Sequence, residues 1–252
     1  MLNESEIAHY HQHGFVMPRF QMPDAVIESI KREHTALVQA NPHYIDYCPA
    51  LLDIAPVFLE YCLNPTIIEL VSQLIGPDVA LWNASFFAKP ALKGKRTPWH
   101  QDGEYWPITP LATCTVWLAV DDSNRENGCL RVIRGSHRER SLRRHHQVHV
   151  GEVTLTQALD ASEFDETQAV DLVLKAGQIS LHDVFLLHGS EPNQSSSPRR
   201  GMTMRFMPTS SLFDRELAKR KALDMNIVDH SNRPVYLVRG EDRHGKNKFF
   251  KL

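Results

Sequence analysis

The sequence lacks a long hydrophobic run, a strong net charge and any closely spaced pair of cysteines. Without a run of roughly 18 or more apolar residues, we expect no segment that spans a membrane. The formal net charge of −2 gives no electrostatic reason to expect binding to nucleic acid or to an anionic membrane surface. These absences exclude partners that depend on a hydrophobic span or a basic surface, and they leave the oligomeric state open.

The four cysteines are scattered, and no C-x-x-C pair occurs that could form a zinc–thiolate site. The opening residues, Met-Leu-Asn-Glu-Ser-Glu, lack the basic and apolar regions of a signal peptide. We therefore expect a cytoplasmic protein whose thiols stay reduced. Apolar residues make up 42% of the 252 residues and charged residues 23%, which predicts one ordinary globular domain, 1–252.

Start and stop signals in the first quarter of the sequence predict three helices. Asn3 and Glu6 resemble a capping box, and Gly14 is a suitable end for the helix after them. Apolar positions then repeat with a helical period over 24–41 and over 65–76. The histidines of the first two helices are expected at the surface: His9, His11, His13 and His34.

After residue 76 the pattern changes to short β-rich runs separated by turn signals. The predicted strands are 79–89, 113–121, 129–133, 170–174, 178–181 and 202–207. A last helix is predicted over 211–223, and the polar tail 230–252 is expected to lie on the surface. Helices first and many strands later favour an α+β fold, mainly β, with helices on one side of a sandwich or barrel.

His100 and Asp102 are the first candidates for chemistry. On a strand, residues two apart project to the same face, so both side chains can meet one ion. His188, from a distant strand, could complete a site of two imidazoles and one carboxylate, which is typical of non-haem Fe(II) oxygenases. The triplet alone is weak in a chain with 14 histidines, so the interpretation depends on the residues after His188. There a turn-rich loop leads into a strand that begins with arginine, which could pair with a ligand carboxylate.

Several segments together resemble the phytanoyl-CoA dioxygenase family of Fe(II)- and 2-oxoglutarate-dependent oxygenases. They occur in the order FFAKP (86–90), WHQDG (99–103), TVWLAVDD (115–122), ENGCL (126–130), GSH (135–137) and HGS (188–190) through PRRG (198–201). The resemblance implies a double-stranded β-helix, or jelly roll, with flanking N-terminal helices. The helical part would be about 1–76, the jelly-roll core about 77–210, and the C-terminal helix and tail 211–252.

The resemblance also implies the site. Fe(II) would be held by His100, Asp102 and His188, and the 2-oxoglutarate carboxylate would pair with Arg199, or with Arg200 if the register shifts by one. The remaining implied contacts are Trp117, Ser190 and Ser85 for 2-oxoglutarate, and Tyr105 and Trp106 for the substrate.

The implied reaction uses O2 and 2-oxoglutarate, releases CO2 and succinate, and hydroxylates a small-molecule substrate. Halogenating relatives have a small residue where Asp102 stands, so the aspartate favours hydroxylation. Two departures from the family concern the outer wall: Arg134 replaces the usual proline before Gly-Ser-His, and an early lysine has no clear counterpart. The alternatives are a cupin-type metal enzyme that does not use 2-oxoglutarate and a non-catalytic jelly-roll binding protein.

The arginine- and histidine-rich segment 138–150 has two interpretations. It could line a substrate mouth that prefers an anion, or it could be a solvated loop. Because charge runs are mostly solvated, we favour the loop.

Overall fold

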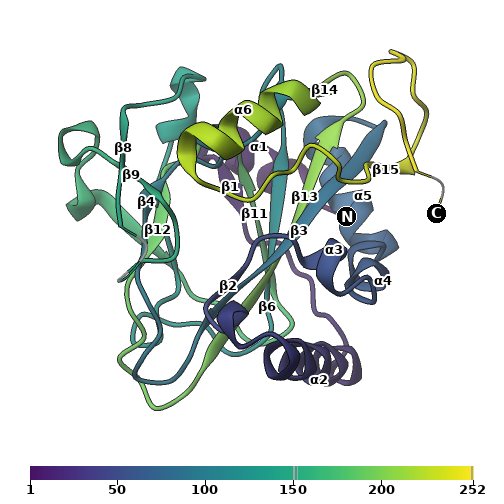
Figure 1. Cartoon of the computed structure of the whole chain (residues 1–252). Helices are drawn as coiled ribbons and strands as arrows, with labels where there is room; N and C mark the ends of the chain where they lie inside the picture. Colours follow the sequence, from purple (N-terminus) through teal and green to yellow (C-terminus); the bar gives the residue numbers. More distant parts are fainter. Residues whose placement is uncertain (150, 152, 251) are drawn as a thin grey trace.

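The computed structural model describes residues 1–149, 151, 153–250 and 252, and its centre is a large antiparallel sheet (Figure 1). The strands of this main sheet follow the order β1–β11–β6–β13–β3–β15, and β2 pairs with β3. Their bounds are β1 Phe15–Val16, β2 Tyr47–Cys48, β3 Val79–Lys89, β6 Cys114–Ala119, β11 Ile179–Asp183, β13 Arg199–Pro208 and β15 Tyr236–Arg239.

A smaller antiparallel sheet has the order β10–β7–β12–β4. Its strands are β4 Thr97–His100, β7 Leu130–Ile133, β10 Ala169–Leu172 and β12 His188–Ser190. The chain alternates between the two sheets, from β6 to β7, from β10 to β11 and from β12 to β13, as in a jelly roll. Two further pairs lie outside the sheets: β5 Ile108–Thr109 with β14 Leu212–Phe213, and β8 His145–Gln147 with β9 Gln157–Leu159.

Helices from the N-terminal part of the chain pack against the main sheet, and α2 and α5 lie against one of its faces (Figure 1). Their bounds are α1 Glu4–His13, α2 Asp24–Ala40, α3 Leu51–Ile54, α4 Phe58–Cys62, α5 Pro65–Ile75 and α6 Arg215–Met225. Short 3-10 turns are η1 Pro42–Tyr44, η2 Asp102–Glu104, η3 Ser136–Glu139, η4 Ala161–Glu163 and η5 Glu166–Gln168. Within the described residues, none of the helices is both long enough and apolar enough to cross a membrane.

The predicted end signals of the N-terminal helices are confirmed. Asn3 and Glu6 form a capping box, and Gly14 ends α1 with a φ of 86°, a conformation that costs glycine little. Asn64 accepts hydrogen bonds from the backbone at the start of α5. Thus the sequence signals set where these helices begin and end.

Alternating side chains give the main sheet two different faces. Val116 and Leu118 of β6, and Met204 of β13, pack with the helices in the largest hydrophobic cluster. Their neighbours along the strands point the other way, toward the smaller sheet, and include Thr115 and Arg205. The helices therefore cover the apolar face, which leaves the polar face free to form a site between the sheets.

Two sequence predictions about buried polar residues are wrong. The tail is not confined to the surface, because β15 adds to the edge of the main sheet and Arg233 is buried. Arg233 can be buried because it donates to Asn83 and to the carbonyl of Pro49. His34 is likewise buried, with its ring 4.3 Å from that of Phe86.

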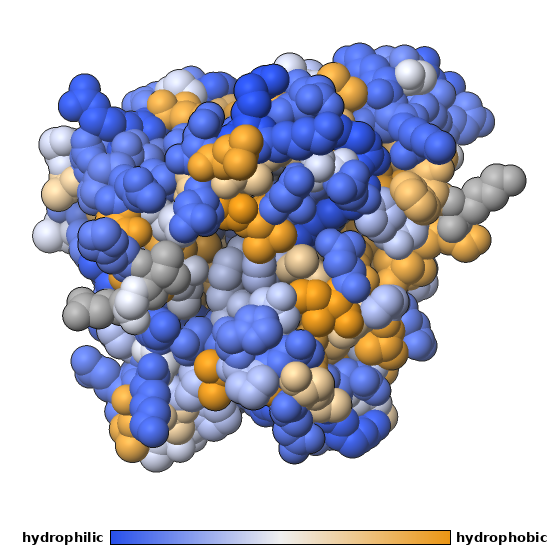
Figure 2. Space-filling model, in the orientation of Figure 1, coloured by the Kyte–Doolittle hydropathy of each residue, from blue (hydrophilic) through white to orange (hydrophobic). Residues whose placement is uncertain are grey.

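The C-terminal helix starts later than predicted. Residues 211–214 lead through β14, and Asp214 caps the backbone of α6, whose first residue is Arg215. On the face seen in Figure 2 the surface is mostly hydrophilic, and hydrophobic side chains gather beneath α6. This helix thus covers one end of the space between the sheets.

Candidate functional site

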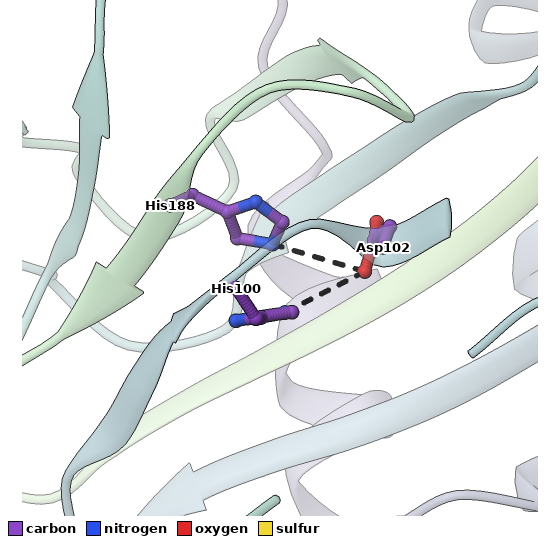
Figure 3. A group of neighbouring side chains, drawn as sticks. All are labelled: His100, Asp102 and His188. Carbon is purple, nitrogen blue, oxygen red and sulfur yellow. Dashed lines mark ion pairs between the residues drawn. The ribbon is translucent and has the colours of Figure 1, made fainter. Parts of the chain in front are cut away.

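His100, Asp102 and His188 converge between the two sheets, and all three are buried (Figure 3). His100 ends β4 and His188 begins β12, and the two residues are direct partners in the strand register. The nearer carboxylate oxygen of Asp102 lies 3.6 Å from Nε2 of His100 and 3.8 Å from Nε2 of His188. One ligand atom from each residue falls within 4.8 Å of the others, a spacing that suits one metal ion.

Hydrogen bonds fix which nitrogen each histidine presents. Nδ1 of His100 lies 2.8 Å from the carbonyl of Pro98, and Nδ1 of His188 lies 2.9 Å from that of Leu186. A carbonyl only accepts, so both Nδ1 atoms carry the proton and both Nε2 lone pairs face the centre. The hydroxyl of Thr115 donates to the other oxygen of Asp102 at 3.0 Å. Such outer contacts orient metal ligands.

The protonation states also suit a cation. Burial by itself would raise the pKa of Asp102, but the neighbouring imidazoles of His100 and His182 hold that pKa well below its usual range. Burial, with His100 nearby, lowers the pKa of His188 well below its usual value. Asp102 is therefore ionised and His188 neutral at pH 7, which are the forms that bind metal ions.

A third buried histidine, His182, lies beside the triad and was missed in the sequence. Its Nε2 is 3.4 Å from Asp102, and its ring centroid is 4.7 Å from that of His188. Among the described residues, neither of its ring nitrogens has a hydrogen-bond partner. The alternation Ile-Ser-Leu-His in β11, with apolar residues toward the helices, could have placed it on the inner face.

Arg199 lies inside the small cavity next to the triad, whereas Arg200 points to the opposite face. The Arg199 guanidinium donates to the carbonyl of Gly128 through Nε and Nη2 and to that of Phe87 through Nη1. Burial lowers the pKa of Arg199 to about 10, so it remains charged at pH 7. Arg200 instead pairs with Asp121 through two contacts of 2.7 Å.

The small cavity also brings together most of the other predicted co-substrate contacts. Trp117 and Ser190 both line it, and the Arg199 guanidinium lies 5.4 Å from the Trp117 ring centroid. Ser85 does not line it; the Ser85 hydroxyl contacts Arg205 and donates to the carbonyl of Pro49. The full lining is Phe87, Thr97, His100, Asp102, Thr115, Trp117, Leu130, His182, His188, Ser190, Arg199, Thr203 and Arg205.

A second cavity of about 220 Å³ adjoins the first and contains the predicted substrate residues, Tyr105 and Trp106. The two cavities share Phe87, His100, Asp102 and Arg205. Its other lining residues are Tyr47, Pro49, Asn83, Thr154, Leu155, Thr156, Asn226, Ile227, Val228 and His230. A molecule held in this space therefore reaches the triad.

Charged residues of the segment 138–150 are engaged with protein groups instead of lining either cavity. Arg140 lies 2.7 Å from Asp183, and His146 lies 2.6 Å from Asp160. Arg143 donates to the carbonyl of Glu163. These contacts agree with the loop interpretation.

Solved structures share this fold. The non-heme monooxygenase ThoJ superposes with a TM-score of 0.73 and 24% identity, covering 97% of this chain and 86% of that chain. EvdO2 from Micromonospora carbonacea var. aurantiaca, complexed with 2-oxoglutarate, gives a TM-score of 0.70 at 20% identity, covering 82% of this chain and 91% of that chain. The predicted jelly roll with N-terminal helices is confirmed.

Curated relatives are similar in sequence to most of this chain. A phytanoyl-CoA dioxygenase domain-containing protein 1 homolog of Dictyostelium discoideum is 33% identical over 160 residues, which is 63% of this chain and 57% of that relative. The peroxisomal phytanoyl-CoA dioxygenase of Homo sapiens is 27% identical over 224 residues, which is 78% of this chain and 66% of the human protein. This chain therefore spans about three fifths of the length of these relatives.

The family model described as phytanoyl-CoA dioxygenase matches residues 10–201, a range that contains the triad, Trp117 and Arg199. The match begins in α1 and ends early in β13, so it covers the smaller sheet and the main sheet except for most of β13 and β15. It also contains the motifs that suggested the resemblance in the sequence. On this match, the chain belongs to the phytanoyl-CoA dioxygenase family.

Proposed function

We propose that this protein is an Fe(II)- and 2-oxoglutarate-dependent dioxygenase that hydroxylates a small molecule with release of CO2 and succinate. The main support for the proposal is that a possible metal centre and a charged arginine lie side by side in one buried space. A two-histidine, one-carboxylate centre adjoins a cavity that contains the charged guanidinium of Arg199. The first suits iron and the second suits the far carboxylate of 2-oxoglutarate.

His100, Asp102 and His188 would hold the iron. The donor set fits, because both imidazoles present Nε2, the carboxylate is ionised, and Thr115 and two backbone carbonyls fix the ligands in place. Bound iron would supply the activation of O2, coupled to oxidation of 2-oxoglutarate. The protein's own work is to position the reactants and exclude water.

Arg199 would orient 2-oxoglutarate. Three of its five N–H groups donate to backbone carbonyls, which lock the side chain and leave two donors for a carboxylate. Trp117 and Ser190 would contact the same ligand from the cavity wall. The Ser85 hydroxyl contacts Arg205, and a direct contact of Ser85 with 2-oxoglutarate stays a prediction.

Tyr105 and Trp106 would contact the substrate in the second cavity. The Tyr105 hydroxyl donates to the carbonyl of Gln157 at 3.0 Å, so that the ring is held rigidly. The charged arginine in the first cavity favours this proposal over a cupin-type enzyme or a binding protein, which have no need of it. A cytoplasmic location stays a prediction.

The metal assignment is tested with His100→Ala, Asp102→Ala and His188→Ala. Loss of an outer-shell partner typically costs roughly 10- to 100-fold in metal affinity, so each loss of a ligand should cost at least about 100-fold. Fe(II) affinity is measured anaerobically, and succinate release is measured with 2-oxoglutarate and O2. Circular dichroism should show a retained fold, because the sheets pack without the metal.

His43→Ala is the matched control, since His43 is exposed and far along the chain from the triad. It should bind Fe(II) like the wild type. Wild-type metal affinity in any of the three triad variants would remove that residue from the centre.

A further inference from the structure

We propose that Arg205 binds the carboxylate of the substrate, so that the enzyme acts on a small carboxylic acid with an apolar body. This inference rests on the proposed function and names its substrate class. The carboxylate would lie against Arg205 where the two cavities join, and the body would occupy the second cavity beside the triad.

Arg205 has the position that such an anchor needs. It lies on β13 six residues after Arg199, an even spacing that sends both side chains to the inner face. Arg205 is only 4% exposed, and it lines both cavities. Its Nη1 donates to the hydroxyl of Ser85, and its guanidinium lies 5.2 Å from the Trp106 ring centroid. These contacts fix the side chain without neutralising its charge.

The guanidinium has hydrogen-bonding capacity left over. Within the described part of the chain, Nε of Arg205 has no hydrogen-bond partner, and no carboxylate lies within ion-pair distance of the side chain. Arg199 shares this lack of a carboxylate partner, whereas two other buried arginines have one: Arg131 pairs with Asp171 at 3.0 Å and Arg233 lies 3.5 Å from Asp53. A buried, unpaired charge is costly, so Arg205 is held ready for an anion.

The charge balance of the loaded site points to a monoanion. With Fe(II) and 2-oxoglutarate in place, the two charges of 2-oxoglutarate and that of Asp102 would offset the metal and Arg199. Among the described residues that line the two cavities, Asp102 is the only acid. Arg205 is then the charge without a counterpart, and one carboxylate would supply it.

The second cavity supplies the rest of the recognition. Its walls include Trp106, Leu155 and Ile227, which suit an apolar or aromatic body. Apart from Arg205 and Asp102 of the triad, the polar lining groups carry no charge at pH 7: Asn83 is an amide, and burial, followed by the charges of Arg233 and Arg205, lowers the pKa of His230 to about 2. The body of the acid would therefore meet no competing charge between Arg205 and the triad.

The test titrates pairs of carboxylates and their amides into protein loaded with Mn(II) and saturating 2-oxoglutarate. Suitable pairs are 3-phenylpropionate with 3-phenylpropanamide and hexanoate with hexanamide. Calorimetry measures the affinity for each compound. Because a charge-assisted hydrogen bond contributes roughly 1.5–3 kcal/mol, the wild type should prefer at least one carboxylate over its amide by about tenfold or more. Arg205→Gln should abolish that preference, and Arg205→Lys should keep part of it.

Arg200→Gln is the matched control, because it removes an arginine from the outer face of the same strand. It should keep the carboxylate preference, and it should bind 2-oxoglutarate like the wild type. Arg199→Gln should weaken 2-oxoglutarate binding, whereas Arg205→Gln should leave it within about threefold. This crossed pattern separates the two anchors.

Failure of the Arg205 proposal and failure of the proposed function would give different results. If the wild type binds 2-oxoglutarate but prefers no carboxylate in any pair, the anchor is wrong and the proposed function stands. If Arg205→Gln loses 2-oxoglutarate and Arg199→Gln does not, Arg205 serves the co-substrate and the inference is overturned. If the metal-loaded wild type binds no 2-oxoglutarate, the proposed function fails and this inference fails with it. The comparison within the wild type holds even if Arg205→Gln does not fold.

Discussion

Arg199 and Arg200 are neighbours in the chain, but their side chains point to opposite faces of the main sheet. Arg199 is 2% exposed inside the small cavity, and Arg200 forms an ion pair with Asp121 on the other face of the sheet. Alternation along an extended strand allows only one of two adjacent side chains into the cavity. Of the two, only Arg199 can therefore contact a ligand in the small cavity.

Arg199→Lys should weaken 2-oxoglutarate binding roughly 10- to 100-fold, because lysine cannot reproduce the planar pair of donors. The loss corresponds to one or two charge-assisted hydrogen bonds. Calorimetric titration of the Mn(II)-loaded protein measures the effect, and affinity for the metal itself should not change.

Arg200→Lys serves as the paired control, and it should bind 2-oxoglutarate like the wild type. If Arg200→Lys loses affinity and Arg199→Lys does not, then the assignment of the two arginines is reversed.

The sequence allowed prediction of site residues where local spacing carries information. His100 ends β4 and Asp102, two residues later, begins η2 after the extended residue Gln101, so the two side chains still meet; Arg199 comes after His188 through a recognisable turn-rich loop. His182 and Arg205 belong to no recognisable motif; alternation in β11 and β13 indicates their face but not what they meet there. Their importance appears only when distant strands are brought together.

β13 organises the site at the scale of the element. It pairs with β3 on one side and with β6 on the other, and it carries both Arg199 and Arg205. Opposite it, the Trp117 ring of β6 lies directly over Gly201. A Cβ atom at that glycine would stand 2.1 Å from the ring. The Trp117 ring can therefore occupy this position only because Gly201 has no side chain.

Gly201→Ala should push the Trp117 ring out of place, because a methyl group cannot fit in that space. Overpacking of this kind typically costs about 1–3 kcal/mol of the free energy of unfolding. The displaced ring lies beside Arg199, so 2-oxoglutarate affinity should fall as well. Urea denaturation and calorimetric titration measure the two effects.

Gly151→Ala is the control, since no atom of the described residues, apart from the chain neighbours, lies within 4 Å of a Cβ built there. It should leave both measurements unchanged. Wild-type stability in Gly201→Ala would show that the strand or the ring yields without cost.

The elements that were predicted are those with a long repeat or a clear end signal, such as α2, α5 and β3. Those missed are short or at an edge. Helix α3 has four residues, too few to show a period, and β15 pairs through its backbone at the sheet edge. The apolar run of β15 is only Tyr-Leu-Val, which is too short to stand out in an otherwise polar tail.

Several histidines buried far from one another make the whole molecule sensitive to acid. Burial is the main cause that lowers the pKa of His34 and of His145 to about 4 and that of His230 to about 2. All three are therefore neutral in the folded protein at pH 5 to 7. In the unfolded chain they would regain an ordinary pKa near 6.5.

Stability should fall as the pH drops from about 6.5 to about 4. In that range the unfolded chain takes up protons at these histidines and the folded protein does not, so protons favour unfolding. The slope is at most roughly 1.4 kcal/mol per pH unit for each histidine. Urea denaturation at pH 7 and at pH 5 measures it.

His34→Leu isolates one contribution, because His34 packs against Phe86 away from the triad and Nε2 of His34 has no hydrogen-bond partner among the described residues. The variant should show a shallower loss of stability between pH 7 and pH 5. An unchanged slope would mean that His34 takes up a proton in the folded protein.

The order of elements along the chain was enough to predict the fold class, because helices first and paired strands later have few compact solutions. It was harder to predict which residues would face the space between the sheets. Their orientation depends on the bulge in the pairing of β13 with β3 after Arg205, and such irregularities leave no mark in the apolar pattern.

The second cavity is built by parts of the chain that are far apart in sequence. Tyr105 and Trp106 come soon after the first two residues of the triad, whereas 226–230 belongs to the C-terminal segment after α6. The wall of this cavity can therefore change without a change in the triad. An engineer who exchanges only this late segment would reshape the pocket while leaving the triad and Arg199 as they are.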